Sequence, residues 1–132
     1  MNSAIITAAG SGHRFGEEKQ FKKLHDKPLY QYSLDIFIKS GLFDEIILVV
    51  PNSNQEKIQQ EVRRKYGSQV NLVVGGLNRQ DSVKNAIQNS NPKIDLVVIH
   101  DAARPFVTKT LIEECISACK ISDGAIIAIQ PN

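Results

Sequence analysis

This sequence lacks the long apolar segments that membrane proteins and secreted precursors carry. No apolar run approaches the roughly 18 residues that a membrane span requires, which argues against an integral membrane protein. The N-terminus has no basic flank followed by a long apolar core, which argues against a secretory leader. We therefore expect a soluble, cytoplasmic protein.

The sequence also lacks a large excess of either sign of charge. The net charge is only +2, and the positive residues are scattered rather than gathered in one block. This bias is too weak for a nucleic-acid-binding surface, whereas acidic small molecules remain possible partners. With 132 residues, 42% of them hydrophobic and 23% charged, the chain can bury the core of one globular domain. We assign residues 1–132 to a single domain.

Cysteine is rare, with Cys115 and Cys119 as the only two. Their spacing places them on one face of a predicted helix, together with Leu111, Ile112 and Ile116. This pattern is typical of reduced cysteines in an apolar core. A redox or metal site would need further ligands nearby, and this stretch of sequence lacks them.

Short β-branched runs alternate with segments of helical period along the chain. The runs expected to be buried strands are residues 3–7, 45–50, 69–74, 96–100 and 124–129. Apolar stripes of helical spacing lie between them. The alternation predicts an α/β fold, a three-layer α/β/α sandwich around a mostly parallel sheet. Ligands of such folds bind at the carboxyl ends of strands, so the candidate loops follow Thr7, Val74 and His100.

The first candidate loop is the stretch TAAGSGHRFGEEKQF, residues 7–21. It is not a nucleotide P-loop, because Phe15 stands where the second glycine of that motif would follow Gly10. It also departs from the dinucleotide fingerprint, since the third glycine arrives one residue late, at Gly16. Binding of NAD is therefore not expected.

What this loop does contain is a run of small residues and two cations. Arg14 and Lys19 add positive charge beside backbone amides that a ligand can approach closely. This composition indicates a phosphate-binding loop, and the alternative is a plain glycine-rich turn with solvated charges. The small residues are Ala8, Ala9, Gly10, Ser11 and Gly12.

The second candidate loop is VVGGLNRQDSV, residues 73–83, where a predicted strand runs into Gly75 and Gly76 and then into a helix. Paired glycines allow close approach of a ligand. If this loop neighbours the first, its amides can read the edge of a nucleobase, with Arg79 and Ser82 as further donors. The alternative is a simple turn followed by a helix cap. The residues available for that cap are Asn78 and Asp81.

The third candidate loop is VVIHDAARPF, residues 97–106, in which Asp101 follows an apolar strand. A carboxylate at this position faces the ligand crevice, where it can hold magnesium or a ribose hydroxyl. The alternative is a structural role, as a cap or as the partner of Arg104 in a salt bridge. His25 and His100 are expected to be structural.

In their order and spacing, the stretches AAGSGHRF…KQF, GG..R..SV and HDAARPF resemble the 2-C-methyl-D-erythritol 4-phosphate cytidylyltransferase family. The resemblance covers nearly the whole chain. It implies a Rossmann-like nucleotidyltransferase fold and transfer of CMP from CTP to methylerythritol phosphate in the non-mevalonate isoprenoid pathway, with magnesium and release of pyrophosphate. A related enzyme that acts on ribitol 5-phosphate shares the skeleton. Two pairs favour the methylerythritol enzyme: Ser82-Val83 and Ala102-Ala103.

The resemblance also implies how each motif meets the nucleotide. The small residues 8–12 would wrap the CTP, while Gly75, Gly76 and Ser82 would read the cytosine. The residues that would lie by the ribose and the metal are Asp101 and Ala102.

Arg14 and Lys19 would be the catalytic pair. In this family the substrate phosphate attacks the α-phosphate in line and pyrophosphate leaves, so charge builds on the α-phosphate. Fixed cations and magnesium stabilise that charge, and no protein nucleophile is required.

The sequence departs from the family pattern at His13, Glu18 and Leu77, where arginine, proline and an acidic residue are frequent. Leu77 is expected to weaken base recognition, and Glu18 to alter how Lys19 is aimed. Family members continue past Asn132, so we expect the nucleotide-binding part of a longer, homodimeric architecture whose remainder holds the polyol phosphate. The alternative is a CTP-binding module without turnover.

Overall fold

A parallel sheet forms the centre of the molecule. The computed structural model describes residues 1–9 and 21–119, and its sheet has the strand order β5-β4-β1-β6. All three pairings within this sheet are parallel. The strands are β1 (Asn2–Thr7), β4 (Glu45–Val50), β5 (Asn71–Val74) and β6 (Leu96–Asp101).

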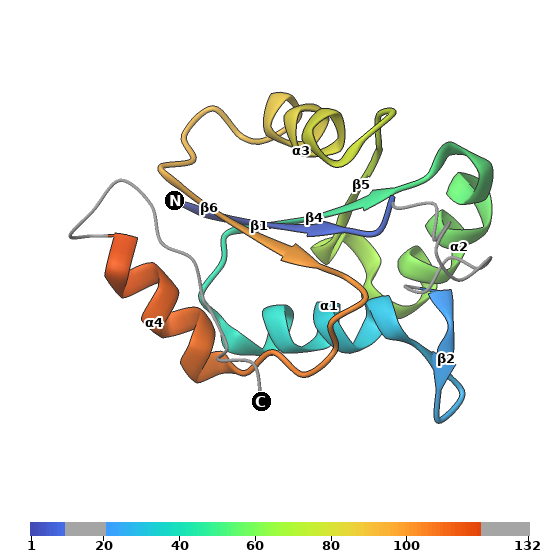
Figure 1. Ribbon diagram of the computed structural model, residues 1–132, viewed down its shortest axis with the longest axis horizontal. Helices are drawn as coiled ribbons and strands as arrows, with labels where there is room; N and C mark the ends of the chain where they lie inside the picture. Colours follow the sequence, from blue (N-terminus) through green and yellow to red (C-terminus); the bar gives the residue numbers. More distant parts are fainter. Residues whose placement is uncertain (10–20, 120–132) are drawn as a thin grey trace.

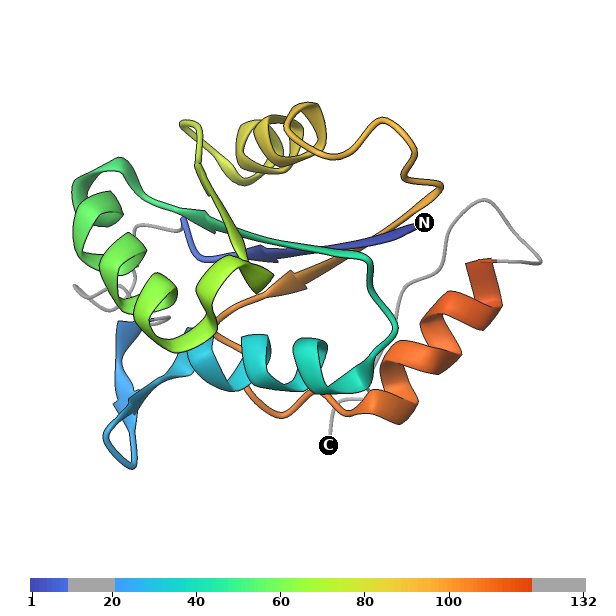
Figure 2. The same ribbon diagram turned by 180° about the vertical axis from the view of Figure 1, so that it is seen from behind.

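Helices cover both faces of this sheet (Figure 1). Helix α3 (Arg79–Gln88) lies on one face, and α1 (Leu29–Ser40) and α4 (Lys109–Cys119) lie on the other. Viewed from behind, α2 (Gln55–Tyr66) lies beside α1 (Figure 2). The three-layer α/β/α fold with a mostly parallel sheet is therefore confirmed. The expected strand at residues 124–129 lies outside the described residues.

The remaining elements are short. A two-stranded antiparallel hairpin, β2 (Lys23–Leu24) and β3 (Lys27–Pro28), precedes α1, and 3-10 turns precede α2 and β5. The third strand begins at Asn71 rather than at residue 69, because Gln69 belongs to the 3-10 turn Gly67–Gln69. The other 3-10 turn is Asn52–Asn54.

The two central strands are buried on both faces. In β1 and β4 every residue after the first is buried, whereas the outer strands β5 and β6 are mostly half-buried. A strand covered by helices on both sides requires a continuous apolar sequence, and runs such as EIILVV supply it. The same runs were the signal that identified these strands.

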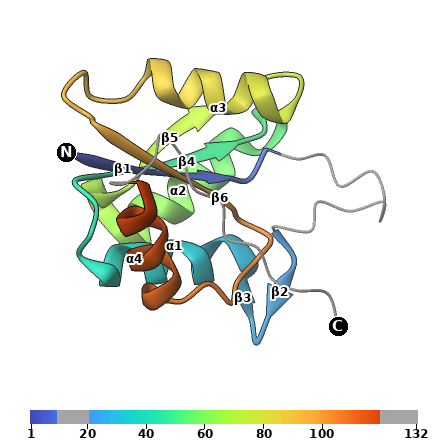
Figure 3. The same ribbon diagram turned by 60° about the vertical axis from the view of Figure 1, so that its left-hand side comes forward.

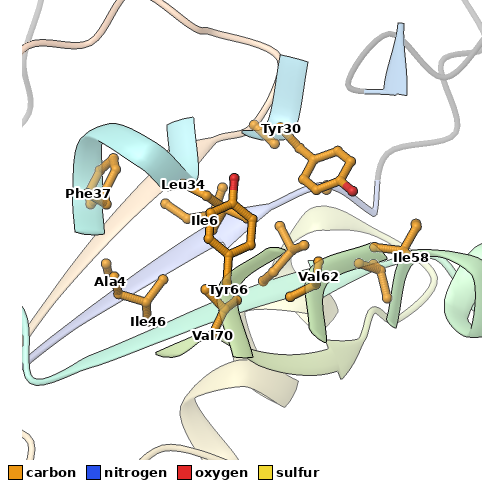
Figure 4. Packing of buried hydrophobic residues seen from close by; sticks show 14 of the residues in the cluster. Ala4, Ile6, Tyr30, Leu34, Phe37, Ile46, Ile58, Val62, Tyr66 and Val70 are labelled. Carbon is orange, nitrogen blue, oxygen red and sulfur yellow. The ribbon is translucent and has the colours of Figure 1, made fainter. Parts of the chain in front are cut away.

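Alternation along the strands divides the core into two clusters. The larger one joins Ala4, Ile6 and Ile46 to the apolar stripes of α1 and α2 (Figure 4). The smaller one lies on the opposite face, where Ile5 packs with Ala86 of α3. Each large side chain buried in this way stabilises the fold by roughly 1.5–3 kcal/mol.

A layer of polar contacts joins α1 to α2. The Tyr30 hydroxyl donates to Glu61 Oε2 at 2.9 Å, and the Tyr66 hydroxyl donates to Asp35 Oδ1 at 2.7 Å. Burial raises the pKa of Tyr30 to about 12, and burial together with the bond to Asp35 raises the pKa of Tyr66. Lys27 of the hairpin also pairs with Asp35, which ties the hairpin to both helices.

The cysteine prediction is partly met. Cys115 and Cys119 on α4 form no disulfide, but both are half-buried rather than fully buried, and Ile112 is the fully buried residue of this helix. Burial raises the pKa of the Cys115 thiol, which keeps it protonated. Within residues 1–9 and 21–119, no helix is long and apolar enough to cross a membrane.

Candidate functional site

The three candidate loops leave the sheet at one edge. The parallel hydrogen-bond ladder continues one residue past the strands, since Ala8 N donates to Val49 O at 2.7 Å and Ala102 N donates to Thr7 O at 3.0 Å. Figure 3 shows β1 and β6 ending on the same side of the molecule, near the hairpin β2–β3. The loops expected from the sequence are thus brought together by the strand order.

The first and second loops are in direct contact. A Cβ atom added to Gly75 would lie 2.5 Å from the Cβ of Ala9 and 3.3 Å from Val49 Cγ1. Gly75 N also donates to Val50 O at 2.9 Å, so the backbone of the second loop runs against the sheet. The prediction that the second loop reads a base required it to lie beside the first loop, and the two loops do lie side by side.

Ser82 shapes the second loop from within. Its hydroxyl accepts a hydrogen bond from Gly76 N at 3.1 Å and donates one to Asn78 O at 3.0 Å, and the residue is 3% exposed. A Cβ atom at Gly76 would lie 2.4 Å from Asp81 Cβ. The glycine pair therefore lets the loop fold onto the first turn of α3.

The helix cap named as the alternative role of the second loop is present at the N-terminus of α3. The side chain of Asn78 accepts a hydrogen bond from Asp81 N at 2.8 Å. Arg79 and Leu77 are exposed beside this cap, Leu77 completely so. Their side chains are free of the packing that fixes the glycines and Ser82, and both are available to a ligand.

The third loop is a tight turn that starts at Asp101. The carboxylate Oδ1 accepts a hydrogen bond from Ala103 N at 2.9 Å, and Oδ2 lies 4.0 Å from Arg104 Nε. Ala102 is completely buried, and its backbone N–H is bonded to Thr7 O in the sheet. The salt bridge named as an alternative therefore exists, and a side-chain turn at Asp101 takes the place of the expected cap, while the Asp101 side chain remains 38% exposed.

Two side chains that sequence reasoning did not assign to the site hold this turn. His100 Nε2 lies 2.9 Å from the carbonyl oxygen of Arg104, and Ser33 Oγ of α1 donates to the same oxygen at 3.4 Å. Burial lowers the pKa of His100, whose ring lies 5.3 Å from that of Phe37. No local pattern could reveal Ser33, because its partner is 71 positions away.

The metal expectation rests on one carboxylate. Within residues 1–9 and 21–119, no three His, Cys, Asp or Glu side chains cluster as a metal site would require. Asp101 alone fits the way magnesium is held beside nucleotides, by one or two carboxylates with ligand phosphates and water completing the shell. The donor set therefore fits a metal that arrives with a phosphate ligand.

The predicted catalytic cations, Arg14 and Lys19, lie outside the described residues, and so do the departures His13 and Glu18. Of the small residues in the first loop, Ala8 and Ala9 are described. The other three lie outside the described residues, namely Gly10, Ser11 and Gly12.

Comparison with known proteins points to one family. Residues 2–131 match the family described as IspD, 2-C-methyl-D-erythritol 4-phosphate cytidylyltransferase. The chain is 41% identical over 135 residues to the protein of that name from Clostridium beijerinckii, and spans 59% of its length.

Solved structures show the same fold. A 4-diphosphocytidyl-2C-methyl-D-erythritol synthase from Anaerococcus prevotii superposes with a TM-score of 0.79 at 31% identity, covering 91% of this chain and 51% of that one. The manganese complex of Rv0371c from Mycobacterium tuberculosis shares the fold at 19% identity, with a TM-score of 0.67 and coverage of 93% of this chain and 66% of that one. On these matches, the chain belongs to the 2-C-methyl-D-erythritol 4-phosphate cytidylyltransferase (IspD) family.

Proposed function

We propose that residues 1–132 form a nucleotidyltransferase domain that binds CTP for the transfer of CMP to 2-C-methyl-D-erythritol 4-phosphate. The observation that carries the proposal is the convergence of the loops after β1, β5 and β6 at one sheet edge, in a chain of this family. In the reaction an oxygen of the acceptor phosphate bonds to the α-phosphorus of CTP. The bond from that phosphorus to the bridging oxygen breaks, and pyrophosphate leaves.

The nucleotide would lie across the first and second loops. We assign the triphosphate to the small residues that begin with Ala8 and Ala9 and continue through residues 10–12. Cytosine would be read by the backbone of Gly75 and Gly76, whose course Ser82 fixes through its two hydrogen bonds. Arg79 is exposed at the same loop and is assigned to the nucleotide as well.

Charge on the α-phosphate would be stabilised by Arg14 and Lys19, the catalytic pair. Asp101 would hold magnesium through its carboxylate, which is 38% exposed, and Ala102 would lie close to the ribose. When bound, magnesium supplies positive charge that neutralises the phosphates. A divalent ion is supported by the donor chemistry of Asp101 and by the manganese that Rv0371c, a protein of the same fold, holds in its crystal.

The remaining parts of the proposal concern partners and location. We propose a homodimer that acts in the cytoplasm on small molecules and has no nucleic-acid partner. The family resemblance supports the dimer, and the net charge of +2 supports the absence of a nucleic-acid surface.

Thermal unfolding with each of the four ribonucleoside triphosphates and magnesium tests the nucleotide assignment. CTP should raise the melting temperature most, since a ligand at 100 times its dissociation constant stabilises by about 2.7 kcal/mol. Asp101→Asn should reduce the shift. The matched control is Glu113→Gln, because Glu113 is an exposed carboxylate on α4. Equal shifts for all four nucleotides would refute base recognition.

A further inference from the structure

The carbonyl oxygen of Arg104 in the third loop has two side chains within hydrogen-bond distance. His100 Nε2 of β6 lies 2.9 Å from it, and the Ser33 hydroxyl of α1 donates to it at 3.4 Å. These contacts come from two elements, the strand that leads into the turn and helix α1. The peptide group after Arg104 is therefore fixed by side chains rather than by a sheet or a helix.

The rest of this turn is held by hydrogen bonds from three backbone N–H groups. Arg104 N donates to Asp101 O at 3.1 Å, Ala103 N donates to Asp101 Oδ1 at 2.9 Å, and Ala102 N donates to Thr7 O at 3.0 Å. In contrast, the Arg104 side chain is 79% exposed and that of Asp101 is 38% exposed. A rigid backbone that presents exposed charged groups is the arrangement expected of a preorganised binding site.

His100 and Ser33 are polar residues at positions where apolar residues could pack. Ser33 is completely buried on α1, on the helix side that also carries Leu34 and Phe37 of the core. A buried hydroxyl weakens a core unless it makes a hydrogen bond, and an alanine would fill this site without that requirement. The His100 ring packs at a tilt against Phe37, while its Nε2 lies within hydrogen-bond distance of the carbonyl oxygen. The contact that both side chains make with the Arg104 carbonyl oxygen explains why polar residues occupy these two positions.

We propose that His100 and Ser33 are positioning residues of the nucleotide site. By holding the Arg104 carbonyl, they fix the turn and so aim the Asp101 carboxylate at the metal that accompanies CTP. Neither residue needs to touch the nucleotide. The inference rests on the proposed function only for the identity of that ligand.

Affinity for CTP with and without magnesium tests this role. His100→Leu keeps apolar bulk but removes the donor, so CTP affinity in magnesium should fall about five-fold or more, the worth of one neutral hydrogen bond. Affinity measured in a chelator should change much less. Ser33→Ala should act in the same direction and more weakly, because its bond is longer. His100→Gln and Ser33→Thr, which keep donors, should recover most of the affinity.

The matched control is Ser40→Ala, because Ser40 is also a buried serine of α1 but donates to Phe37 O at 2.6 Å, within its own helix. It should leave the magnesium dependence unchanged. If His100→Leu and Ser33→Ala lowered affinity equally with and without magnesium, or only lowered the melting temperature as Ser40→Ala does, the positioning role would be refuted.

Amide hydrogen exchange without any ligand gives an independent measurement. The Ala103 and Arg104 amides should exchange faster in His100→Leu and Ser33→Ala, and at the wild-type rate in Ser40→Ala. Unchanged exchange in both variants would overturn the inference. A wild-type chain that failed to bind CTP would instead refute the proposed function, while the exchange rates would still decide whether these side chains hold the turn.

Discussion

At the scale of single residues, Gly75 shows two uses of one glycine. The sequence suggested that it lets a ligand approach the backbone. In the structure the nearest neighbours are protein atoms, with Ala9 Cβ 2.5 Å and Ser82 Oγ 2.7 Å from the place of a Cβ atom. Because Gly75 has no side chain, the first and second loops can touch, and its backbone would also be open to a nucleobase.

We expect Gly75→Ala to destabilise the fold by about 1–3 kcal/mol, the usual effect of overpacking a tight contact. Chemical denaturation measures this directly. Adding Ala9→Gly should recover part of the loss, because it removes the closest of the clashing atoms, and the double-mutant cycle should give a coupling energy well above zero. A Gly75→Ala variant as stable as wild type would show that the loops are not packed as described.

At the scale of elements, α1 and α2 are joined through buried tyrosines. The Tyr30 hydroxyl reaches Glu61 and that of Tyr66 reaches Asp35, and burial raises both pKa values above the ordinary value of 10.0. The neutral phenols are thus part of the helix interface. Ionising either one would place a negative charge beside a carboxylate in a poorly solvated layer.

The free energy of unfolding should therefore fall at alkaline pH. Tyr30 loses its proton near pH 10 when unfolded but only near 12 when folded, so its contribution is fully present below pH 10 and is lost as the pH rises toward 12. Urea denaturation between pH 8 and pH 11.5 should show a loss on the order of 1–3 kcal/mol. Tyr30→Phe should reduce this pH dependence, leaving the part that Tyr66 contributes; an unchanged slope would contradict the assignment.

At the scale of the whole molecule, the strand order makes three distant loops into one edge. Binding of CTP with magnesium should slow amide exchange in residues 8–9, 75–78 and 101–104 together. The opposite edge, where Asn2 N donates to Asp44 Oδ2 and the amino group of Met1 pairs with Asp95, should be unaffected. Exchange measured by mass spectrometry on peptides decides this, and protection confined to one loop would contradict a shared site.

Much of the fold could be predicted because the signals are local. Runs such as residues 45–50 indicate buried strands by composition alone, and four of the five expected strands lie in the described chain within two residues of their predicted bounds. The hairpin β2–β3 was missed, since its turn places His25 and Asp26 at φ values of 53° and 64°, where Asn-Gly is the usual signal.

The site was predictable only where motif residues follow a strand. Asp101 and Gly75 do so, and parallel topology then brings their loops to one edge. Ser33 contacts a carbonyl 71 positions away, and the hydrogen bond from Gly76 N to Ser82 depends on how α3 packs on the sheet. The local sequence therefore predicts neither contact. Burial and distant pairing are properties of the assembled molecule.

The central place of β1 also matters while the chain is being made. β1 is the first strand synthesised, yet one of its two partners is β6, and Thr7 bonds to the carbonyl of His100, 93 positions later. At translation rates of about 5–20 residues per second, the ribosome takes on the order of 5 to 20 seconds to supply that partner. During this interval the edge of β1 that pairs with β6 has no partner on the nascent chain. We therefore expect a chaperone that binds extended apolar segments to protect the chain at this stage.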